Sequence, residues 1–272
     1  MRLSVVIITY NEEANIGRTL QSVQPLVADG KGEIIVVDSG STDRTVEIAN
    51  SLGAKVFVEK WKGFAAQKNS AVEKAAGDWI LSLDADEELE RDLPGLILHV
   101  TSGPKPAGVM DIPLSFSGVS GYWLRRRNKF MGRWIEHGGY WPDPKLRLFR
   151  RGSGRFATRL VHEDVQIEGT TVPILSGALI HHSYPTLSDY IDHMNHYSSL
   201  GAEMVVAKGR VRFSFINIVL RPLFTFIYNY IFRLGFLDGR EGLLLHLYHA
   251  VYVSWKYAKA WELSRQKKPM SS

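Results

Sequence analysis

The chain carries two carboxylates, one residue apart, directly after an apolar run. Residues Trp79–Leu83 have the composition of a buried strand, and Asp84 and Asp86 follow at once. Two acids this close repel each other unless a cation lies between them. Carboxylate oxygens suit Mg²⁺ or Mn²⁺, which also bind substrate phosphates. Acidic pairs occur in solvated loops as well, but this position predicts a Mg²⁺ or Mn²⁺ site at a strand end.

A second apolar run, Glu33–Val37, ends in Asp38, and Gly40 permits a tight turn after it. A carboxylate at a strand end can accept hydrogen bonds from a base N–H or a ribose hydroxyl. Lys68 shares the apolar stripe of a predicted helix over 64–76, where a cation must reach solvent or meet an anion. These residues together predict a site for a nucleoside diphosphate and a metal.

The elements that position these side chains alternate between strands and helices. This alternation predicts an α/β fold with a doubly wound, mostly parallel sheet flanked by helices, whose ligands bind beyond the carboxyl ends of the strands. We expect one domain over 1–185, with a nucleotide-binding half (1–102) and an acceptor-side half (103–185). Strands are predicted at 3–9, 33–37, 55–58, 79–83, 109–113, 121–125, 146–149 and 171–175, and helices at 42–52 and 64–76, with a further helix starting at 11–13.

The C-terminal residues 186–272 form a separate helical region in this reading, with helices over 186–207, 213–233 and 240–263. The last two are rich in aromatic residues, and Pro222–Phe232 has no charge between Arg221 and Arg233. Tyr and Trp beside basic residues favour a membrane interface. We expect these helices to lie on the inner leaflet rather than to span it. A helical layer that packs on the domain, or an oligomer interface, is the alternative.

Composition narrows the classes of protein. The sequence has no cysteine, which excludes disulfides and thiolate catalysis. The apolar N-terminus indicates a first buried strand rather than a signal peptide. Residues 121–160 hold 11 Lys/Arg against 2 Asp/Glu, whereas residues 1–120 hold 11 against 17. Such a basic segment can face nucleic acid, anionic lipid or a phosphorylated substrate, or can be a solvated face.

The segment 132–143 combines aromatic rings, glycines and polar ends, and its His137, Trp141 and Asp143 are candidate acceptor contacts. Rings of this kind stack on sugars, although they also stack on single-stranded nucleic acid. The diphosphate site favours a sugar nucleotide and a phosphorylated glycolipid over nucleic acid. Further on, Glu163 offers a general base, and His181 a metal ligand or a structural histidine.

Several motifs resemble those of inverting family 2 glycosyltransferases of the GT-A fold. They are Val-Val-Ile-Ile-Thr9-Tyr10-Asn11-Glu12-Glu13, Val-Val-Asp38-Ser-Gly-Ser-Thr-Asp43 and Leu-Asp84-Ala-Asp86-Glu87. Arg147-Leu-Phe-Arg-Arg151, Arg159-Leu-Val-His162-Glu163 and Gly235-Phe-Leu-Asp-Gly239 resemble the branch that builds lipopolysaccharide core, which includes a β-1,4-glucosyltransferase. The resemblance implies a metal-dependent, inverting transfer of a sugar, glucose by preference, from a UDP-sugar to a core acceptor at the cytoplasmic face of the inner membrane. The alternatives are a polyprenyl-phosphate glycosyltransferase and a silent carbohydrate- or lipid-binding protein; an oligomer is compatible with each.

The same resemblance implies roles for individual residues. Glu163 corresponds to the catalytic base of a Glu-Asp motif, but here His162 precedes it and Asp164 follows it. That departure leaves Glu163 and Asp164 as alternatives, of which we favour Glu163. The other implied contacts are Thr9, Tyr10 and Glu12 with the nucleoside, Asp38 with base or ribose, Lys68 near the base, Asp84 with ribose or metal, and Asp86 with the metal.

Overall fold

The structure is a computed structural model that describes residues 2–30, 32–102, 118–157, 164–174, 176–209 and 211–266. The chain forms two compact units. Unit 1 comprises the described residues within 1–126, 143–158 and 163–182, and unit 2 those within 127–142 and 183–272. The predicted division into 1–185 and 186–272 stays a prediction. In the structure the segment 127–142 belongs to unit 2, because its hydrophobic side chains share a core with the C-terminal helices.

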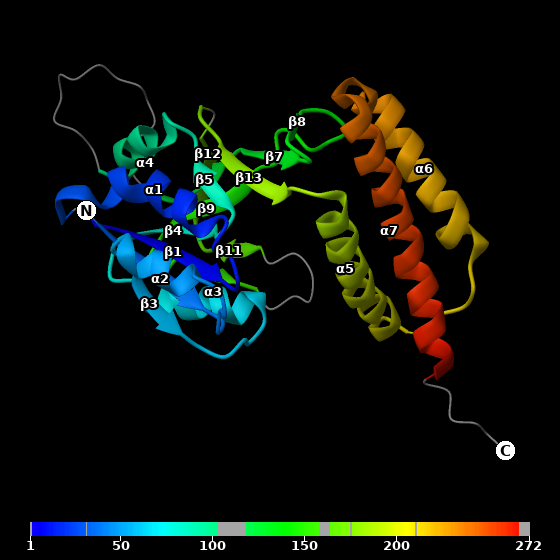
Figure 1. The fold of residues 1–272 in the computed structure, drawn as a ribbon, viewed down its shortest axis with the longest axis horizontal. Coiled ribbons are helices and arrows are strands. Elements are labelled where there is room, and N and C mark those ends of the chain that lie inside the picture. Colours follow the sequence, from blue (N-terminus) through cyan, green and yellow to red (C-terminus); the bar gives the residue numbers. More distant parts are fainter. Residues whose placement is uncertain are drawn as a thin grey trace. The chain divides into compact units, whose positions relative to one another are not determined.

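Unit 1 is built on a seven-stranded sheet (Figure 1). Strands β1 to β4 are parallel, and β9 is antiparallel to both of its neighbours. The predicted mostly parallel α/β sheet is therefore confirmed, with one antiparallel insertion. In spatial order the strands are β12 (Thr170–Pro173), β6 (Val119–Leu124), β9 (Lys145–Arg150), β4 (Trp79–Asp84), β1 (Leu3–Thr9), β2 (Gly32–Asp38) and β3 (Lys55–Val58).

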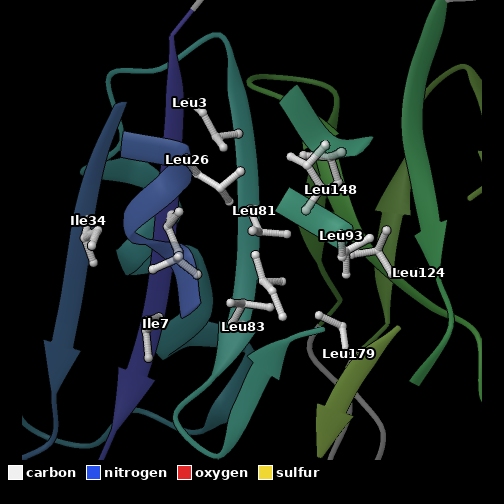
Figure 2. Close-up of a cluster of buried hydrophobic side chains, with 14 of the residues drawn as sticks. Leu3, Ile7, Leu26, Ile34, Leu81, Leu83, Leu93, Leu124, Leu148 and Leu179 are labelled. Atoms are coloured by element: carbon white, nitrogen blue, oxygen red, sulfur yellow. The ribbon is translucent and has the colours of Figure 1, made fainter. Parts of the chain in front are cut away.

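Helices cover both faces of this sheet because successive side chains of a strand point to opposite faces. Leu3, Val5 and Ile7 pack in one cluster with α1, α2 and α4, part of which Figure 2 shows. Val6 packs on the other face with α3 and the β10–β11 hairpin. The elements are α1 (Ile16–Val27), η1 (Ala28–Gly30), α2 (Thr45–Ser51), α3 (Phe64–Glu73), α4 (Leu93–Thr101), β10 (Gly154–Phe156) and β11 (Val165–Ile167).

Two predicted details of this half were wrong. The first helix begins at Ile16 rather than at 11–13, because the polar residues before it bond to a neighbouring loop. The third helix ends at Glu73 instead of continuing to 76. Gly77 follows four residues later, where a Cβ would lie 2.7 Å from the Ser4 amide nitrogen. The predicted strand at 109–113 lies outside the described residues.

A short strand pair completes unit 1 beside the turn that carries Asp84 and Asp86, which we call the acidic turn. Strand β5 (Glu87–Leu89) follows β4 at once, and β13 (Leu179–Tyr184) pairs with it in antiparallel fashion. The register places His181 opposite Glu87. This pairing brings the histidine predicted as a metal ligand to the turn that carries the two aspartates.

Unit 2 contains the three C-terminal helices predicted from sequence. Helices α5 (Leu187–Ala207) and α7 (Gly239–Gln266) pack along each other, and α6 (Arg221–Ile227) packs on α7 (Figure 1). The helix of α6 continues at both ends as π-helical turns, η2 (Ile216–Leu220) and η3 (Tyr228–Phe232). Unit 2 also contains the short η4 (Gly235–Asp238), β8 (Arg133–Ile135) and β7 (Arg126–Phe130), whose first residue belongs to unit 1.

The core of unit 2 explains why the segment 127–142 joins it. Phe130 and Ile135 are buried with Tyr190 of α5 and Leu245 of α7. The rings of Phe130 and Tyr190 meet edge to face, with centroids 5.4 Å apart. None of the helices in the described part of the chain combines the length and the apolar character needed to cross a bilayer.

Candidate active site

The sheet register brings the predicted site residues to one edge. Thr9 at the end of β1 lies opposite Asp38 at the end of β2, and its neighbour Ile8 lies opposite Asp84 at the end of β4. The carboxyl ends of three adjacent parallel strands therefore meet, as the alternating pattern predicted. The Thr9 hydroxyl is buried and has no hydrogen-bond partner among the described residues, and its predicted contact with the nucleoside stays a prediction.

The loops that follow β1 and β2 hold each other. The Asn11 amide donates to Ser41 Oγ at 2.8 Å, and the Thr42 amide donates to Asn11 Oδ1 at 2.8 Å. The Glu12 amide donates to Thr45 Oγ1 at 2.8 Å, at the start of α2. Asn11 lies at φ 53°, a left-handed conformation that Asn tolerates better than most residues. The Asn11-Glu12 motif thus organises a two-loop platform and does not begin a helix.

Asp38 anchors its own turn. Its side chain is fully buried, and Oδ1 accepts hydrogen bonds from the amides of Gly40 at 2.9 Å and Ser41 at 2.8 Å, while the Ser41 hydroxyl contacts Oδ2. Gly40 has φ 93°, which strongly favours glycine there. These bonds shape the platform after β2. The predicted contact of Asp38 with a base or ribose stays a prediction.

Asp84 is bound by two cations. Lys68 Nζ lies 2.7 Å from Asp84 Oδ1, and Arg147 Nη2 contacts Asp84 Oδ2. The Lys68 side chain is only 6% exposed, which excludes the alternative that it reaches solvent. Burial would raise the pKa of Asp84, but Arg147 and Lys68 hold it well below its ordinary value. The anion that Lys68 meets within the chain is therefore Asp84.

A buried acid ties the acidic turn to β9 and β7. Glu87 is completely buried, and its Oε1 lies 2.7 Å from Arg147 Nη2 and 3.1 Å from Arg126 Nη1. Arg126 also contacts Asp143 Oδ2 at 2.7 Å. Burial would lower the pKa of Arg126, yet Glu87 and Asp143 raise it, so the guanidinium stays charged. The sequence left open whether the basic segment faces an external anion or solvent, and part of it instead neutralises acids of the site.

Asp86 faces His181. Their side-chain atoms Oδ2 and Nε2 are 3.2 Å apart, on residues that are both partly accessible. Burial would raise the pKa of Asp86, but the nearby His181 lowers it, so the group is a carboxylate at neutral pH. The turn itself is fixed, because Thr19 Oγ1 donates to the Ala85 carbonyl at 2.6 Å and the His182 amide donates to the Asp86 carbonyl at 3.1 Å.

Glu12 adds a carboxylate near this turn. Its Oε2 accepts from Asn15 Nδ2 at 2.8 Å. Burial raises the pKa of Glu12, and the negative charges of Asp86, Asp43 and Asp84 raise it further against the effect of Asn15. A cation would relieve this mutual repulsion, and the metal site predicted from the sequence stays a prediction. Tyr10, by contrast, is 57% exposed and is the most accessible of the predicted nucleoside contacts.

The three candidate acceptor residues have different surroundings. Asp143 belongs to unit 1 and lies 3.0 Å from Lys145 in addition to Arg126. His137 and Trp141 belong to unit 2, where His137 Nδ1 lies 2.9 Å from Asp238 Oδ1 and the Trp141 ring lies 5.6 Å from the Arg127 guanidinium. Their role towards an acceptor stays a prediction.

The general base is not tested by the geometry. Glu163, the favoured residue, lies outside the described residues. Its alternative Asp164 is described and exposed, and its carbonyl accepts from the Ala157 amide at 3.2 Å. The choice between the two carboxylates therefore stays open.

Sequence reasoning missed three residues of the site: Glu87, Arg126 and Arg147. A signal was present, because Arg147 interrupts the apolar alternation of a predicted strand and Glu87 follows the two aspartates. A charged residue inside a buried strand needs a partner. The identity of that partner depends on which strand lies next to the charged residue, and the sequence pattern does not predict the order of the strands.

Comparison with known proteins decides the family. Residues 4–159, which include the platform loops, the acidic turn and Arg147, match the family described as Glycosyl transferase family 2. The chain belongs to this family. The match covers more than half of the sequence and confirms the resemblance found in the motifs.

Relatives of this glycosyltransferase extend over nearly its whole length. It is 31% identical over 272 residues to the lipopolysaccharide core biosynthesis glycosyltransferase LpsC of Rhizobium meliloti, covering 96% of this chain and 92% of that protein. It is 30% identical over 273 residues to a glycosyltransferase of Rickettsia typhi described as uncharacterized, covering 97% and 88%. The similarity to LpsC is the finding that bears on the acceptor.

A solved structure confirms the GT-A type of fold. The glycosyltransferase resembles the mannosyltransferase PcManGT of Pyrobaculum calidifontis, solved with GDP-mannose and Mn²⁺, with a TM-score of 0.51 and 16% identity. The similarity covers 99% of this chain and 76% of that one. At this identity it supports the arrangement of strands and helices and says nothing of this enzyme's donor.

Proposed function

We propose that this family 2 glycosyltransferase moves a sugar, glucose by preference, from a UDP-sugar to a lipopolysaccharide core acceptor with inversion, at the cytoplasmic face of the inner membrane. The single observation that carries the proposal is the acidic turn, where Asp86 and His181 meet beside a fixed loop platform. The similarity to LpsC supports the acceptor class. The motif resemblance supports UDP, glucose and inversion.

The proposed metal is held by Asp86 and His181. The donor set fits, because a carboxylate oxygen and an imidazole nitrogen 3.2 Å apart could both turn to one ion. Asp84 is less suited, because Lys68 and Arg147 already contact its two oxygens. No group of three or more acids or histidines among the described residues forms a closed metal cage. Asp86 and His181 would hold the ion, which would offset the charge of the donor diphosphate, and the nitrogen ligand favours Mn²⁺ over Mg²⁺.

The proposed reaction is a direct displacement. The acceptor hydroxyl oxygen bonds to the anomeric carbon, the bond from that carbon to the diphosphate oxygen breaks, and the hydroxyl proton passes to Glu163. When bound, the divalent ion offsets the charge on the departing diphosphate. The buried Lys68 and Arg147 fix the position of the Asp84 carboxylate, and Glu87 fixes Arg147, so the acidic turn is preorganised before substrate arrives.

The proposal is tested by donor hydrolysis and transfer with the full chain. UDP-sugars are screened with and without extracted lipopolysaccharide core, in Mn²⁺ and in chelator. Asp86→Ala should abolish metal-stimulated turnover and weaken Mn²⁺ binding measured by electron paramagnetic resonance, with circular dichroism unchanged. Activity that persists in chelator would refute the metal role. Transfer to polyprenyl phosphate, with no transfer to lipopolysaccharide core, would show that polyprenyl phosphate is the acceptor instead.

The base is tested separately. Glu163→Gln should lower turnover at least about a hundredfold, the usual range for loss of general base catalysis, with little change in UDP-sugar affinity. The matched variant Asp164→Asn serves as the control. If Asp164→Asn shows the larger loss instead, the adjacent carboxylate is the base.

A further inference from the structure

The helix formed by η2, α6 and η3 presents its hydrophobic residues outward. Six large apolar side chains along it are 46–71% exposed, and we call them the outer face: Ile216, Leu220, Leu223, Phe224, Ile231 and Phe232. Ile216, Leu220, Leu223, Phe224 and Ile231 are spaced three, four and seven residues apart, which places them on one side of a helix, and Phe232 directly follows Ile231. A helix on the surface of a soluble domain normally shows polar residues there. This helix shows apolar residues on its exposed side instead.

The opposite side of the same helix is occupied by α7. The Ile218 carbonyl accepts from Ser254 Oγ at 2.8 Å, and Arg221 contacts the Tyr257 hydroxyl and stacks 5.1 Å from its ring centroid. Pro222 is buried. The helix thus has its inner face satisfied within unit 2, and rotating it to hide the outer face would break these contacts. The outer face is therefore a surface that something else covers.

Charge indicates which partner covers it. Between Glu203 and Asp238 the sequence has no acid and five basic residues, of which Lys208, Arg212, Arg221 and Arg233 are described and exposed. Basic residues beside an apolar strip complement a surface that is apolar inside and anionic at its rim, such as a bilayer with acidic headgroups. A second copy of this chain fits less well, because a two-fold contact would bring like charges together.

We infer that the outer face inserts into the interfacial region of an anionic phospholipid bilayer, with the helix lying in the membrane plane. The strip runs along the side of the helix over its whole length, so the partner must run parallel to the helix axis. Phe213 and Phe236, next to the two ends of the helix, are also 58% and 45% exposed. This inference gives the membrane location proposed above a specific surface, and it stands independently of donor and metal.

The principal test is flotation of the full chain with vesicles of phosphatidylethanolamine and phosphatidylglycerol in a 7:3 ratio. A combined Ile216→Ser, Phe224→Ser and Phe232→Ser variant should bind these vesicles at least about a thousandfold more weakly, since each side chain contributes about tenfold or more. The control is Val58→Ser with Trp61→Ser, which removes hydrophobic residues of unit 1 that are 64% and 50% exposed. It should bind like the parent protein.

A charge series checks the rim. Changing Lys208 and Arg212 together to Gln should weaken binding to the same vesicles at low salt by about fivefold for each cation. It should leave the weaker binding to phosphatidylcholine vesicles unchanged. Equal loss on both lipids, or no loss on either, would overturn the role of charge.

A labelling experiment tests the inference even if the combined serine variant fails to fold. The chain has no cysteine, so one introduced cysteine reports a single position. A spin label at Phe224→Cys should become accessible to oxygen and shielded from a water-soluble nickel chelate on vesicles, whereas one at Val58→Cys should stay accessible to nickel. Nickel access at both positions, or a parent protein that forms concentration-dependent dimers through this face and ignores vesicles, would overturn the inference. Donor hydrolysis without vesicles keeps this outcome separate from failure of the proposed activity.

Discussion

Replacing Arg147 by Met should destabilise unit 1 strongly, because the side chain joins two acids inside the protein. Arg147 is 7% exposed, and its Nη2 contacts both Asp84 and the fully buried Glu87. Burial would lower the pKa of Arg147, but Asp84 and Glu87 raise it, so it is charged at any working pH. The methionine keeps the volume and removes the charge.

The magnitude follows from the partners left behind. Removing one member of a buried ion pair costs about 3–5 kcal/mol, because the remaining charge stays desolvated. Glu87 keeps Arg126 at 3.1 Å and Asp84 keeps Lys68 at 2.7 Å, which favours the lower end of that range. About 3 kcal/mol corresponds to a factor of roughly 150 in the opening equilibrium, at about 1.4 kcal/mol per tenfold.

The assay is native-state hydrogen exchange read on peptides from β4 and β9, which reports on unit 1 alone. These peptides should exchange about a hundredfold faster in Arg147→Met. Arg147→Lys should lie between the two, because an ammonium cannot reproduce the planar fork. The matched control is Arg155→Met, at an exposed position of β10. If Arg147→Met exchanges no faster than this control, the buried network does not stabilise the sheet.

Two further predictions concern pH, both read from urea unfolding. Hydrogen bonds from Lys62, Lys74 and Ser70 lower the pKa of Glu59 from 4.5 to about 2. The unfolded chain therefore takes up a proton first, and stability falls as pH drops from 4.5 towards 2. Glu59→Gln should flatten this pH dependence, and an unchanged slope would contradict the prediction. Burial lowers the pKa of His246 to about 4 from 6.5, so unit 2 should lose up to about 3 kcal/mol as pH falls from 6.5 through 4. His246→Met should remove that loss, and equal acid sensitivity in the variant would count against it.

The edge of the sheet that carries the site could be predicted because its cause is local. Each apolar run ends in a polar residue, and parallel strands place such ends together. Thr9, Asp38 and Asp84 lie where this pattern puts them. For Lys68 the sequence left open whether the ammonium reaches solvent or meets an anion, and in the structure it contacts Asp84.

The rest depends on which strands become neighbours. Strand β9 enters the sheet antiparallel beside β4, and only that placement brings Arg147 to Asp84 and Glu87. A sequence pattern gives the period of a strand but not its place in the sheet. For the same reason the basic segment was interpreted as a surface, although Arg126 and Arg147 are largely buried among acids.

The predicted start of the first helix was wrong for a different reason. Asn11 and the acids after it have the composition of a helix N-terminus, and local propensity favours that interpretation. In the fold, Asn11 bonds to the loop after β2, and the helix begins later at Ile16. Contacts between distant residues therefore override a local capping signal, and they do so at the residues that shape the candidate nucleoside pocket.

The two aspartates of the acidic turn have separate roles because their neighbours differ in charge. Asp84 is neutralised inside the protein by Lys68 and Arg147, so a metal ion there would have to compete with two fixed cations. Asp86 has only the imidazole of His181 as its ion-pair partner among the described residues, and an imidazole can itself become a metal ligand. Preorganised cations hold the first carboxylate in place, and they lower the electrostatic cost of placing a second carboxylate one residue away. One acid of the motif is thus held by structural cations, and the other is the one proposed to hold the ion.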